Sequence, residues 1–445
     1  MILTVIAVSA AAYLFSLFKF RGKWVQQQIA FLIIYLIGLT IIGELDILLP
    51  IYFVVSLLPF VPRLRKISMF TGFLGIYFLI YLVYGLMNQD ISGTLVTFIA
   101  KMWQFMVFFI VYDASIDMQE TDYRATIRWA LLVETLLGLY LIFTSTNMDA
   151  NGLVRLVSNA QPITGNLSTV ALPISAFYYM KNRANPKATR WLLMVNIVML
   201  VWIVLSGTRG YTLEFAFTMV LIAYDYYTNG KVGQATQRIR IFTALALGAA
   251  ALLIAVVIPG VLERFSSILR LKSSVGIRTY ENAAIKEFMA NSPILTVIFG
   301  IGLGGTGGSY SAMSAALSRQ FSLGMWDRYH YMNDSGALFH NLYANVLMCL
   351  GILGAAVIIW LNVQMWKRIT KACGNQVLMR RVMHLFQLSF LWMNYYRWSA
   401  VCGIAEMIVF ALILKAMEQN NLKRSVSRRL EKYQQKRTEQ EIRNA

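Results

Sequence analysis

The sequence predicts an all-α polytopic membrane protein, a bundle of about 12–13 transmembrane helices with one large external loop that contains short helices. The first observation is composition: 58% of the 445 residues are AVILMFWYC and only 14% are charged, whereas soluble domains are about 45–50% apolar and about 25% charged. The other two are long apolar runs and basic clusters between alternate runs. A soluble globule is excluded, because its surface would carry apolar patches larger than soluble monomers tolerate.

Thirteen apolar runs are candidate membrane spans. A bilayer core about 30 Å thick requires about 20 apolar residues per helix, since every backbone polar group must be satisfied within the segment. The runs are 2–18, 27–43, 46–62, 68–87, 94–112, 129–145, 167–180, 191–205, 211–227, 241–258, 340–362, 382–398 and 400–417. The first run is followed by basic residues and by no small-residue cleavage site, so we expect a retained span and not a signal peptide.

Basic clusters give the orientation, because Lys and Arg in short loops mark the cytoplasmic side. With an external N-terminus, one face carries the clusters 19–24, 63–66, 114–128, 181–190, 228–240, 366–381 and 415–445. The chain then divides into helices 1–10 (1–258), a large external loop (259–339), helices 11–13 (340–417) and a basic cytoplasmic tail (418–445). We assign the net charge of +19 to contact with membrane lipids, with the tail on the anionic leaflet, and not to nucleic acid.

The external loop contains one amphipathic stretch and one glycine run. The apolar residues of 275–289 recur at 3- and 4-residue spacing, which predicts a helix lying on the bundle: Ile277, Tyr280, Ala284 and Phe288. Residues 300–305 (GIGLGG) satisfy GxGxxG, but no βαβ pattern surrounds them, so we reject a dinucleotide site. We expect this glycine run to allow close approach of two backbones.

Two arginines on the external side are candidates for binding a diphosphate. Arg209 lies in the turn SGTRG, whose small residues leave room for a bidentate guanidinium. Arg278 lies in the amphipathic stretch. Each has a structural alternative: Arg209 as a snorkelling anchor at the lipid boundary, and Arg278 as the i, i+3 partner of Glu281.

His340 is the candidate general base, because it opens the run 340–362 at its external end. A helix N-terminus favours the neutral imidazole, which can remove a proton from a sugar hydroxyl. Its structural alternative is a helix cap or a packing residue. His330, in the aromatic stretch WDRYHY, is the competing external histidine, but no predicted helix fixes it.

The sequence predicts no metal and no cofactor. Acidic residues within the apolar runs are scattered, at Glu134, Glu214, Asp225 and Glu406, and the three cysteines lack metal-ligand spacing. A two-carboxylate glycosidase is equally unsupported.

Three motifs, in order and on one predicted face, resemble the O-antigen polymerase and O-antigen ligase superfamily. They are SGTRG at 206–210, GIRTYENAAIKEF at 276–288 with Pro293 and the glycine run after it, and HNLYANVLMCLGILG at 340–354. The stretch 155–173 is similar to the family's earlier external loop. The resemblance implies a GT-C-like helical fold, a catalytic His340, and diphosphate binding by Arg209 and Arg278.

The resemblance also implies the reaction. We expect a glycosyltransferase that polymerises oligosaccharide units carried on polyprenyl (undecaprenyl) diphosphate into O-antigen or exopolysaccharide. It would act at the outer face of the bacterial cytoplasmic membrane, invert the anomeric centre and need no metal, and a chain-length regulator protein would be a further partner. Weaker substrate contacts are expected from Arg155, Tyr280, His330, Asn341 and Tyr343.

Two alternatives remain open. An O-antigen ligase, which transfers the glycan to lipid A core, would use the same site. The stretch 345–351 lacks the acidic residue that often precedes the first glycine in this family, so the subfamily is undecided. A flippase for polyprenyl-linked glycans is the alternative from another class, with Glu134, Glu214 and Glu406 marking a pathway.

Overall fold

The computed structural model describes the chain with gaps: residues 2–21, 23–42, 45–59, 61, 67–88, 91, 94, 103–114, scattered residues between 128 and 143, 146–148, 154–156, 175, 185–206, 274–303, 342–374, 376–396 and 401–444. These residues confirm the helical class. One short hairpin accompanies the helices: β1 (Thr146–Met148) pairs antiparallel with β2 (Val154–Leu156), and Asn147 lies opposite Arg155. The sequence DANG, which follows β1, is poor in helix formers.

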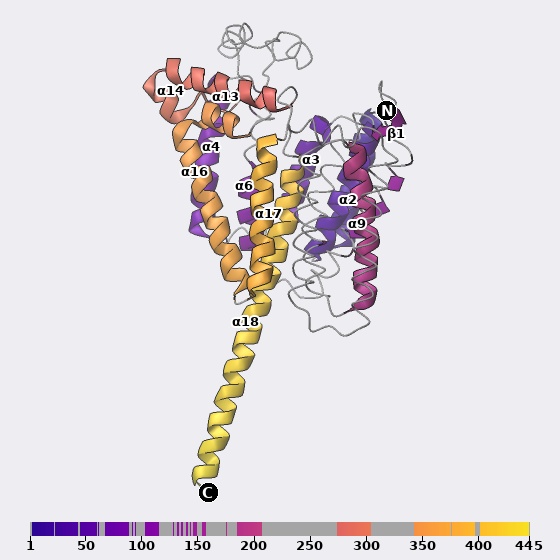
Figure 1. Ribbon diagram of the computed structural model, residues 1–445, viewed down its shortest axis with the longest axis vertical. Helices are drawn as coiled ribbons and strands as arrows, with labels where there is room; N and C mark the ends of the chain where they lie inside the picture. Colours follow the sequence, from indigo (N-terminus) through magenta and orange to yellow (C-terminus); the bar gives the residue numbers. More distant parts are fainter. Residues whose placement is uncertain are drawn as a thin grey trace.

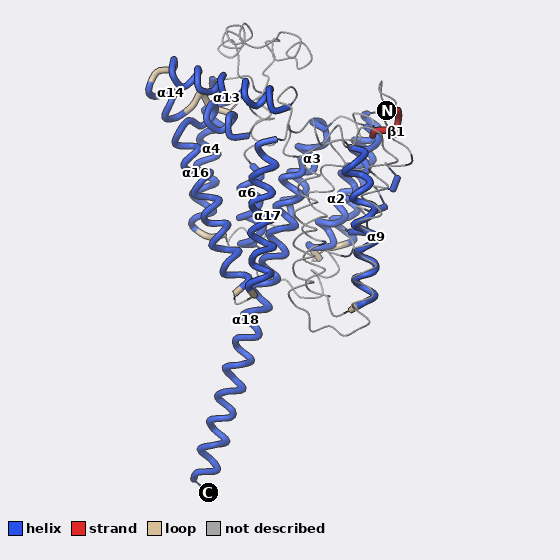
Figure 2. The backbone as a smooth tube through the Cα atoms, in the orientation of Figure 1, coloured by secondary structure: helices blue, strands red, loops and turns tan. Residues whose placement is uncertain are grey.

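Apart from α13 (Ser274–Asn291) and α14 (Ile294–Phe299), which lie in the predicted external loop, the described helices follow the predicted apolar runs (Figures 1 and 2). They are α1 (Ile2–Lys19), α2 (Trp24–Ile42), α3 (Leu45–Leu57), α4 (Met69–Asn88), α6 (Trp103–Ala114), α9 (Pro186–Ser206), α16 (Leu342–Cys373), α17 (Val377–Tyr396) and α18 (Val401–Asn444). The predicted spans 211–227 and 241–258 lie outside the described residues, and 129–145 and 167–180 are described only at scattered positions.

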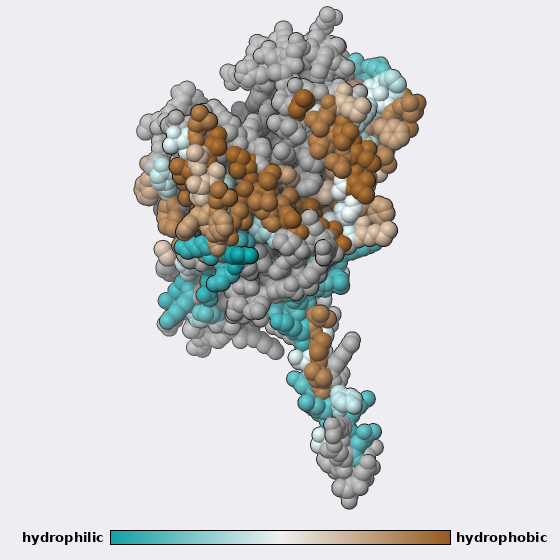
Figure 3. Space-filling model, turned by 180° about the vertical axis from the view of Figure 1, so that it is seen from behind, coloured by the Kyte–Doolittle hydropathy of each residue, from teal (hydrophilic) through white to brown (hydrophobic). Residues whose placement is uncertain are grey.

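Two of these helices are long and apolar enough to cross a membrane, over Met69–Met87 and Leu342–Cys373. The surface of the bundle carries broad apolar areas (Figure 3). On α4 the exposed apolar residues recur 3 or 4 positions apart along one face: Phe73, Ile76, Ile80, Val83 and Met87. An apolar face of this size marks contact with a membrane or another protein, and the length of the helices favours a membrane.

The centre of the bundle is α6, whose residues 105–112 are all buried. Phe105, Phe108 and Phe109 each have 0% exposure, which is typical of a helix that is apolar all round and surrounded by others. α18 packs along α6, and the ring of Phe410 lies 5.6 Å from that of Phe108.

A polar cluster fixes the start of α4 against the end of α6. The Ser68 hydroxyl accepts a hydrogen bond from the Thr71 N–H (3.3 Å), so Ser68 is the N-cap of α4. The Asp113 carboxylate accepts bonds from the Ser68 N–H (3.1 Å) and from the Ser68 and Thr71 hydroxyls (2.6 and 2.7 Å). Arg368 of α16 lies 3.9 Å from the same carboxylate. Chain segments next to three predicted cytoplasmic clusters, 63–66, 114–128 and 366–381, therefore meet at one end of the bundle.

A second polar cluster at this end surrounds Glu418 of α18. Its carboxylate contacts the ammonium groups of Lys371 (2.7 Å) and Lys415 (2.8 Å), and it accepts a hydrogen bond from the Tyr112 hydroxyl (2.8 Å). Burial raises the pKa of Glu418, but the hydrogen bonds from Lys371, Lys415 and Tyr112 and the charge of Lys415 together outweigh burial and lower this pKa to about 2.

Acidification is expected to destabilise the protein through Glu418. Because the folded-state pKa is about 2 and the ordinary value is 4.5, the stabilisation is complete above pH 4.5 and is lost as the pH falls through about 2. Glu418→Gln should lower the thermal unfolding temperature at neutral pH and make it depend less on pH in this window. Glu431→Gln, at an exposed position of the same helix, is the control; an equal effect of both changes would contradict the prediction.

α18 does not end at residue 417, where the sequence predicts the start of a separate tail. It continues to Asn444 as one helix that projects from the bundle (Figure 1). Asn421 anchors it at the point of exit: its amide donates to the Ala372 carbonyl (2.6 Å) and accepts from Gln376 (3.1 Å). The sequence predicts a tail that lies on the membrane surface, whereas residues 418–444 form a helix that projects away from the bundle.

Candidate functional site

The predicted site residues fall unevenly on the described part of the chain. Arg209, His330, His340 and Asn341 lie outside it. Arg155 lies in β2, and Arg278 and Tyr280 lie in the first two turns of α13, where only the backbone is described. Tyr343 is described in full. The site is therefore built from the helices that carry these residues.

α16 is broken at Gly351. This residue has φ 65° and ψ −164°, so the helix consists of a short upper half before Gly351, residues 342–350, and a longer lower half after it, residues 352–373. The sequence predicts an unbroken span over 340–362; the break is the correction. A break removes the helical partners of nearby carbonyl groups, and these must find other donors if the segment is buried.

The segment after α14 supplies those donors. The N–H groups of Ile301 and Gly302 donate to the carbonyls of Met348 and Cys349, each at 3.0 Å. The Tyr81 hydroxyl of α4 donates to the Leu350 carbonyl at 3.5 Å. The glycine run of the external loop is thus bonded to the break in α16.

Glycines make this contact possible. Gly300 (φ 76°) and Gly302 (φ 94°) adopt the left-handed conformation, which side chains disfavour. A Cβ at Gly300 would meet the Cys349 carbonyl, and a Cβ at Gly351 would meet the Ile298 carbonyl. The prediction that the glycine run allows close backbone approach is confirmed.

α13 packs on the same helix. It contacts α16, and its buried residues Ile285 and Phe288 are 7% and 6% exposed. This confirms the predicted helix over 275–289 and, at Phe288, its packing on the bundle. The side chains of the other predicted face residues, Ile277, Tyr280 and Ala284, lie outside the described part. α13, which carries Arg278, therefore lies against α16. The first residue of α16, Leu342, comes two positions after His340 in the sequence.

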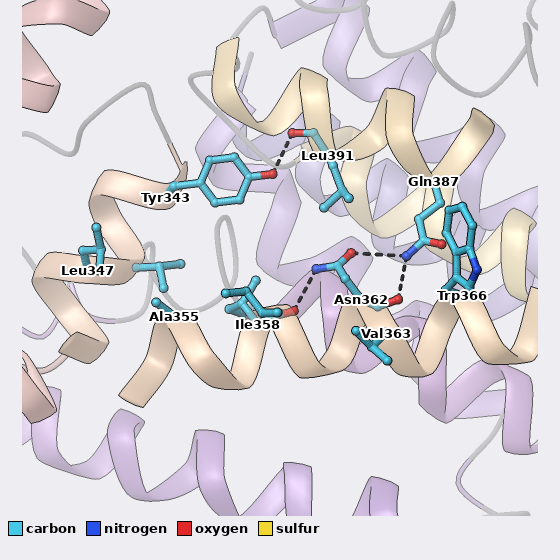
Figure 4. Close-up of a pocket in the computed structure, with 11 residues that line it drawn as sticks. Tyr343, Leu347, Ala355, Ile358, Asn362, Val363, Trp366, Gln387 and Leu391 are labelled. Atoms are coloured by element: carbon cyan, nitrogen blue, oxygen red, sulfur yellow. Dashed lines mark hydrogen bonds between the residues drawn. The ribbon is translucent and has the colours of Figure 1, made fainter. Parts of the chain in front are cut away.

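A groove of about 490 Å³ opens between α16 and α17, beginning at Tyr343 (Figure 4). Its walls are almost entirely apolar. They include residues from both halves of α16 and from α17: Tyr343, Val346, Leu347, Ala355, Ile358, Ile359, Asn362, Val363, Trp366, Gln387 and Leu391. The break at Gly351 shapes the groove, since it separates the upper residues from the lower ones.

Three polar side chains line this groove, and hydrogen bonds hold each of them (Figure 4). The Tyr343 hydroxyl donates to the Leu391 carbonyl at 2.8 Å. The Asn362 amide donates to the Ile358 carbonyl at 2.8 Å, and the Gln387 amide donates to the Asn362 carbonyl at 2.7 Å. The Gln387 Oε1 atom is buried without a hydrogen-bond partner among the described residues.

Sequence reasoning missed Asn362 and Gln387. Both are amide side chains inside predicted apolar spans, 340–362 and 382–398. A polar side chain in such a span marks a polar contact or a ligand position. Their pairing depends on the packing of α17 on α16, which has no linear pattern.

Within the described residues, no group of three or more His, Cys, Asp or Glu side chains could hold a metal ion. Cys349 and Cys373 are buried and are not joined in a disulfide. No family model matches the chain, and no curated protein matches it.

Proposed function

We propose that this chain is a polytopic membrane glycosyltransferase of the O-antigen polymerase and ligase type. It joins oligosaccharide units carried on polyprenyl diphosphate at the outer face of the bacterial cytoplasmic membrane. The observation that carries the proposal is the joining of two of the three family-like motifs. The stretch 276–288 and the glycine run both contact the stretch 340–354, through α13 packing and through the bonds of Ile301 and Gly302.

The membrane position is supported by the surface of the bundle and by its ends. Apolar side chains cover the exposed face of α4, and the ion pairs of Asp113 and Glu418 lie at the end from which the basic part of α18 projects. α13 and α14 lie at the opposite end (Figure 1). A charged end opposite a substrate-binding end fits a protein that crosses the bilayer with basic residues inside.

The proposed chemistry is a direct displacement. The acceptor hydroxyl oxygen attacks the anomeric carbon, the bond from that carbon to the phosphate oxygen breaks, and the electron pair leaves with the lipid diphosphate. His340 takes the hydroxyl proton, and Arg209 and Arg278 stabilise the negative charge of the leaving diphosphate. One displacement inverts the anomeric centre. The arginines supply the positive charge that the leaving group requires.

The groove between α16 and α17 fits the isoprenoid part of such a donor. It is apolar, it starts at Tyr343, three residues after the proposed base in the sequence, and it runs along α16 past Gly351. A polyprenyl chain has no hydrogen-bonding groups, so an apolar groove open to lipid holds it without desolvating polar atoms.

Filling this groove is expected to weaken donor binding. Ala355→Trp places an indole among the wall residues, and we expect the KM for a long-chain donor to rise about tenfold while kcat changes little. A donor with a shortened isoprenoid chain should lose little, because it does not reach Ala355. Ile352→Trp, at an exposed position that does not line the groove, is the matched control. Equal losses with both donors would argue against this use of the groove.

Single-turnover transfer with purified protein tests the proposed function. In detergent, where there are no two sides, a transferase converts a lipid-linked oligosaccharide into a longer chain and free lipid diphosphate, whereas a flippase gives no product. A product formed only when lipid A core is added identifies a ligase. Absence of turnover with every donor and acceptor pair would reject the proposal.

A further inference from the structure

The projecting part of α18 carries an apolar stripe that covers no part of its own bundle. Leu422, Val426, Leu430 and Tyr433 are 64%, 48%, 58% and 70% exposed. Their spacing of 4, 4 and 3 residues places them on one face of the helix over about three turns. Figure 3 shows brown residues bordered by hydrophilic ones on the projecting helix.

The flanks of the stripe are basic. By helix register, Arg429 and Lys436 follow one border, Lys423 lies on the other, and Arg437 continues the line of the stripe one turn beyond Tyr433. Glu431 stands far from the stripe, on the opposite part of the helix. The surface thus combines an apolar strip with cationic borders, which is the chemistry of a groove or helix that receives an acidic amphipathic segment.

A second copy of this chain is a poor occupant. Two copies in one membrane present their α18 helices in parallel, so packing of stripe on stripe would bring Lys423 and Arg437 of one copy against the same residues of the other. Like charges at these facing positions disfavour pairing. An acidic partner reverses the sign of each such interaction.

The bilayer surface is also a poor occupant. The bonds of Asn421 hold α18 at the end of α16, and Leu422 follows directly. The helix continues straight from this anchor and away from the bundle (Figure 1). For the stripe to lie on the adjacent leaflet, the helix would have to break next to this anchor.

We propose that the stripe of Leu422, Val426, Leu430 and Tyr433, with its basic borders, is the docking site for an acidic amphipathic helix of a cytoplasmic protein. The proposal uses the membrane position proposed above and is independent of the transfer reaction. A cytoplasmic partner bound to the stripe would lie within about 30 Å of the inner end of the bundle, since each residue of an α-helix adds about 1.5 Å.

A designed peptide supplies the probe. The full chain in phosphatidylcholine nanodiscs is titrated with a fluorescent helical peptide that has Leu at a and d positions and Glu at e and g, and binding is followed by anisotropy. We expect saturable binding that weakens as salt increases, and no binding of the same peptide with Lys at e and g. Leu430→Ala should weaken binding about tenfold or more, whereas Gln435→Ala, on the opposite part of the helix, should not.

Several outcomes would overturn the proposal. No binding, or equal binding by Leu430→Ala and the unchanged protein, removes the docking site. Binding to phosphatidylcholine vesicles that contain phosphatidylglycerol, without peptide binding, assigns the stripe to lipid. Self-association that Leu430→Ala abolishes assigns it to a second copy. Since none of these readouts measures transfer, failure here leaves the proposed function untouched, and loss of transfer activity would leave the docking result unchanged.

Discussion

Gly300→Ala is expected to destabilise the folded protein by about 3–5 kcal/mol. The new Cβ would meet the Cys349 carbonyl and the Leu350 N–H nitrogen, both of which belong to backbone and cannot rotate away. Alanine also disfavours the φ of 76° at this position. The segment must shift, and a shift weakens the bonds that Ile301 and Gly302 donate to the broken helix.

Gly72→Ala is the matched control for this prediction. Gly72 lies inside α4, and a Cβ there meets nothing within 4 Å. Alanine favours a helix over glycine by about 0.5–1 kcal/mol, so this change should leave the protein as stable or slightly more so. Thermal unfolding of both variants in detergent gives the comparison. If both variants and the unchanged protein have the same unfolding temperature, the contact between residues 300–303 and α16 does not stabilise the fold.

Loss of transfer is the second large effect we expect. Arg209→Ala, Arg278→Ala and His340→Ala should each lower the rate of single-turnover transfer about 10²–10³-fold. The arginine changes remove charge from the leaving diphosphate, and the histidine change removes the base. Because these effects are chemical, the thermal unfolding temperature should stay close to that of the unchanged protein.

Two comparisons separate this from a structural role. Arg381→Ala, at an exposed position of α17, should keep full activity and shows the effect of losing any surface arginine. Arg278→Lys keeps the charge but not the planar fork, so it should retain part of the activity. Wild-type transfer by both Arg209→Ala and His340→Ala would end the proposed mechanism. If His330→Ala instead abolished transfer, the base would be His330.

Hydropathy predicted most of the described helices because apolar side chains avoid water, whether they contact lipid or other helices. α4, α9 and α17 begin and end within a few residues of the predicted runs. The Ser68 cap agrees with the start of the predicted run at 68. The ends of α18 and α16 were not predictable in this way, because charged residues can continue a helix beyond the apolar part when nothing interrupts it.

The break at Gly351 shows why the site was harder to predict than the fold. A glycine in an apolar run is compatible with an unbroken helix, since glycine costs only about 1 kcal/mol in a helix interior. The break is stable because Ile301 and Gly302 lie opposite Met348 and Cys349, and this pairing joins residues about 50 positions apart along the chain. The sequence shows each glycine, but it does not show that residues 300–302 contact residues 348–351.

The break in α16 also constrains biogenesis. A segment released into lipid cannot leave the carbonyls of Met348 and Cys349 without donors, because each unmatched group costs several kcal/mol there. In the membrane position proposed above, α16 would therefore enter the bilayer as an unbroken helix and bend only after the 300–303 segment has reached it. Newly made chains would pass through a straight-helix precursor, and formation of the outer end would be a late step of folding.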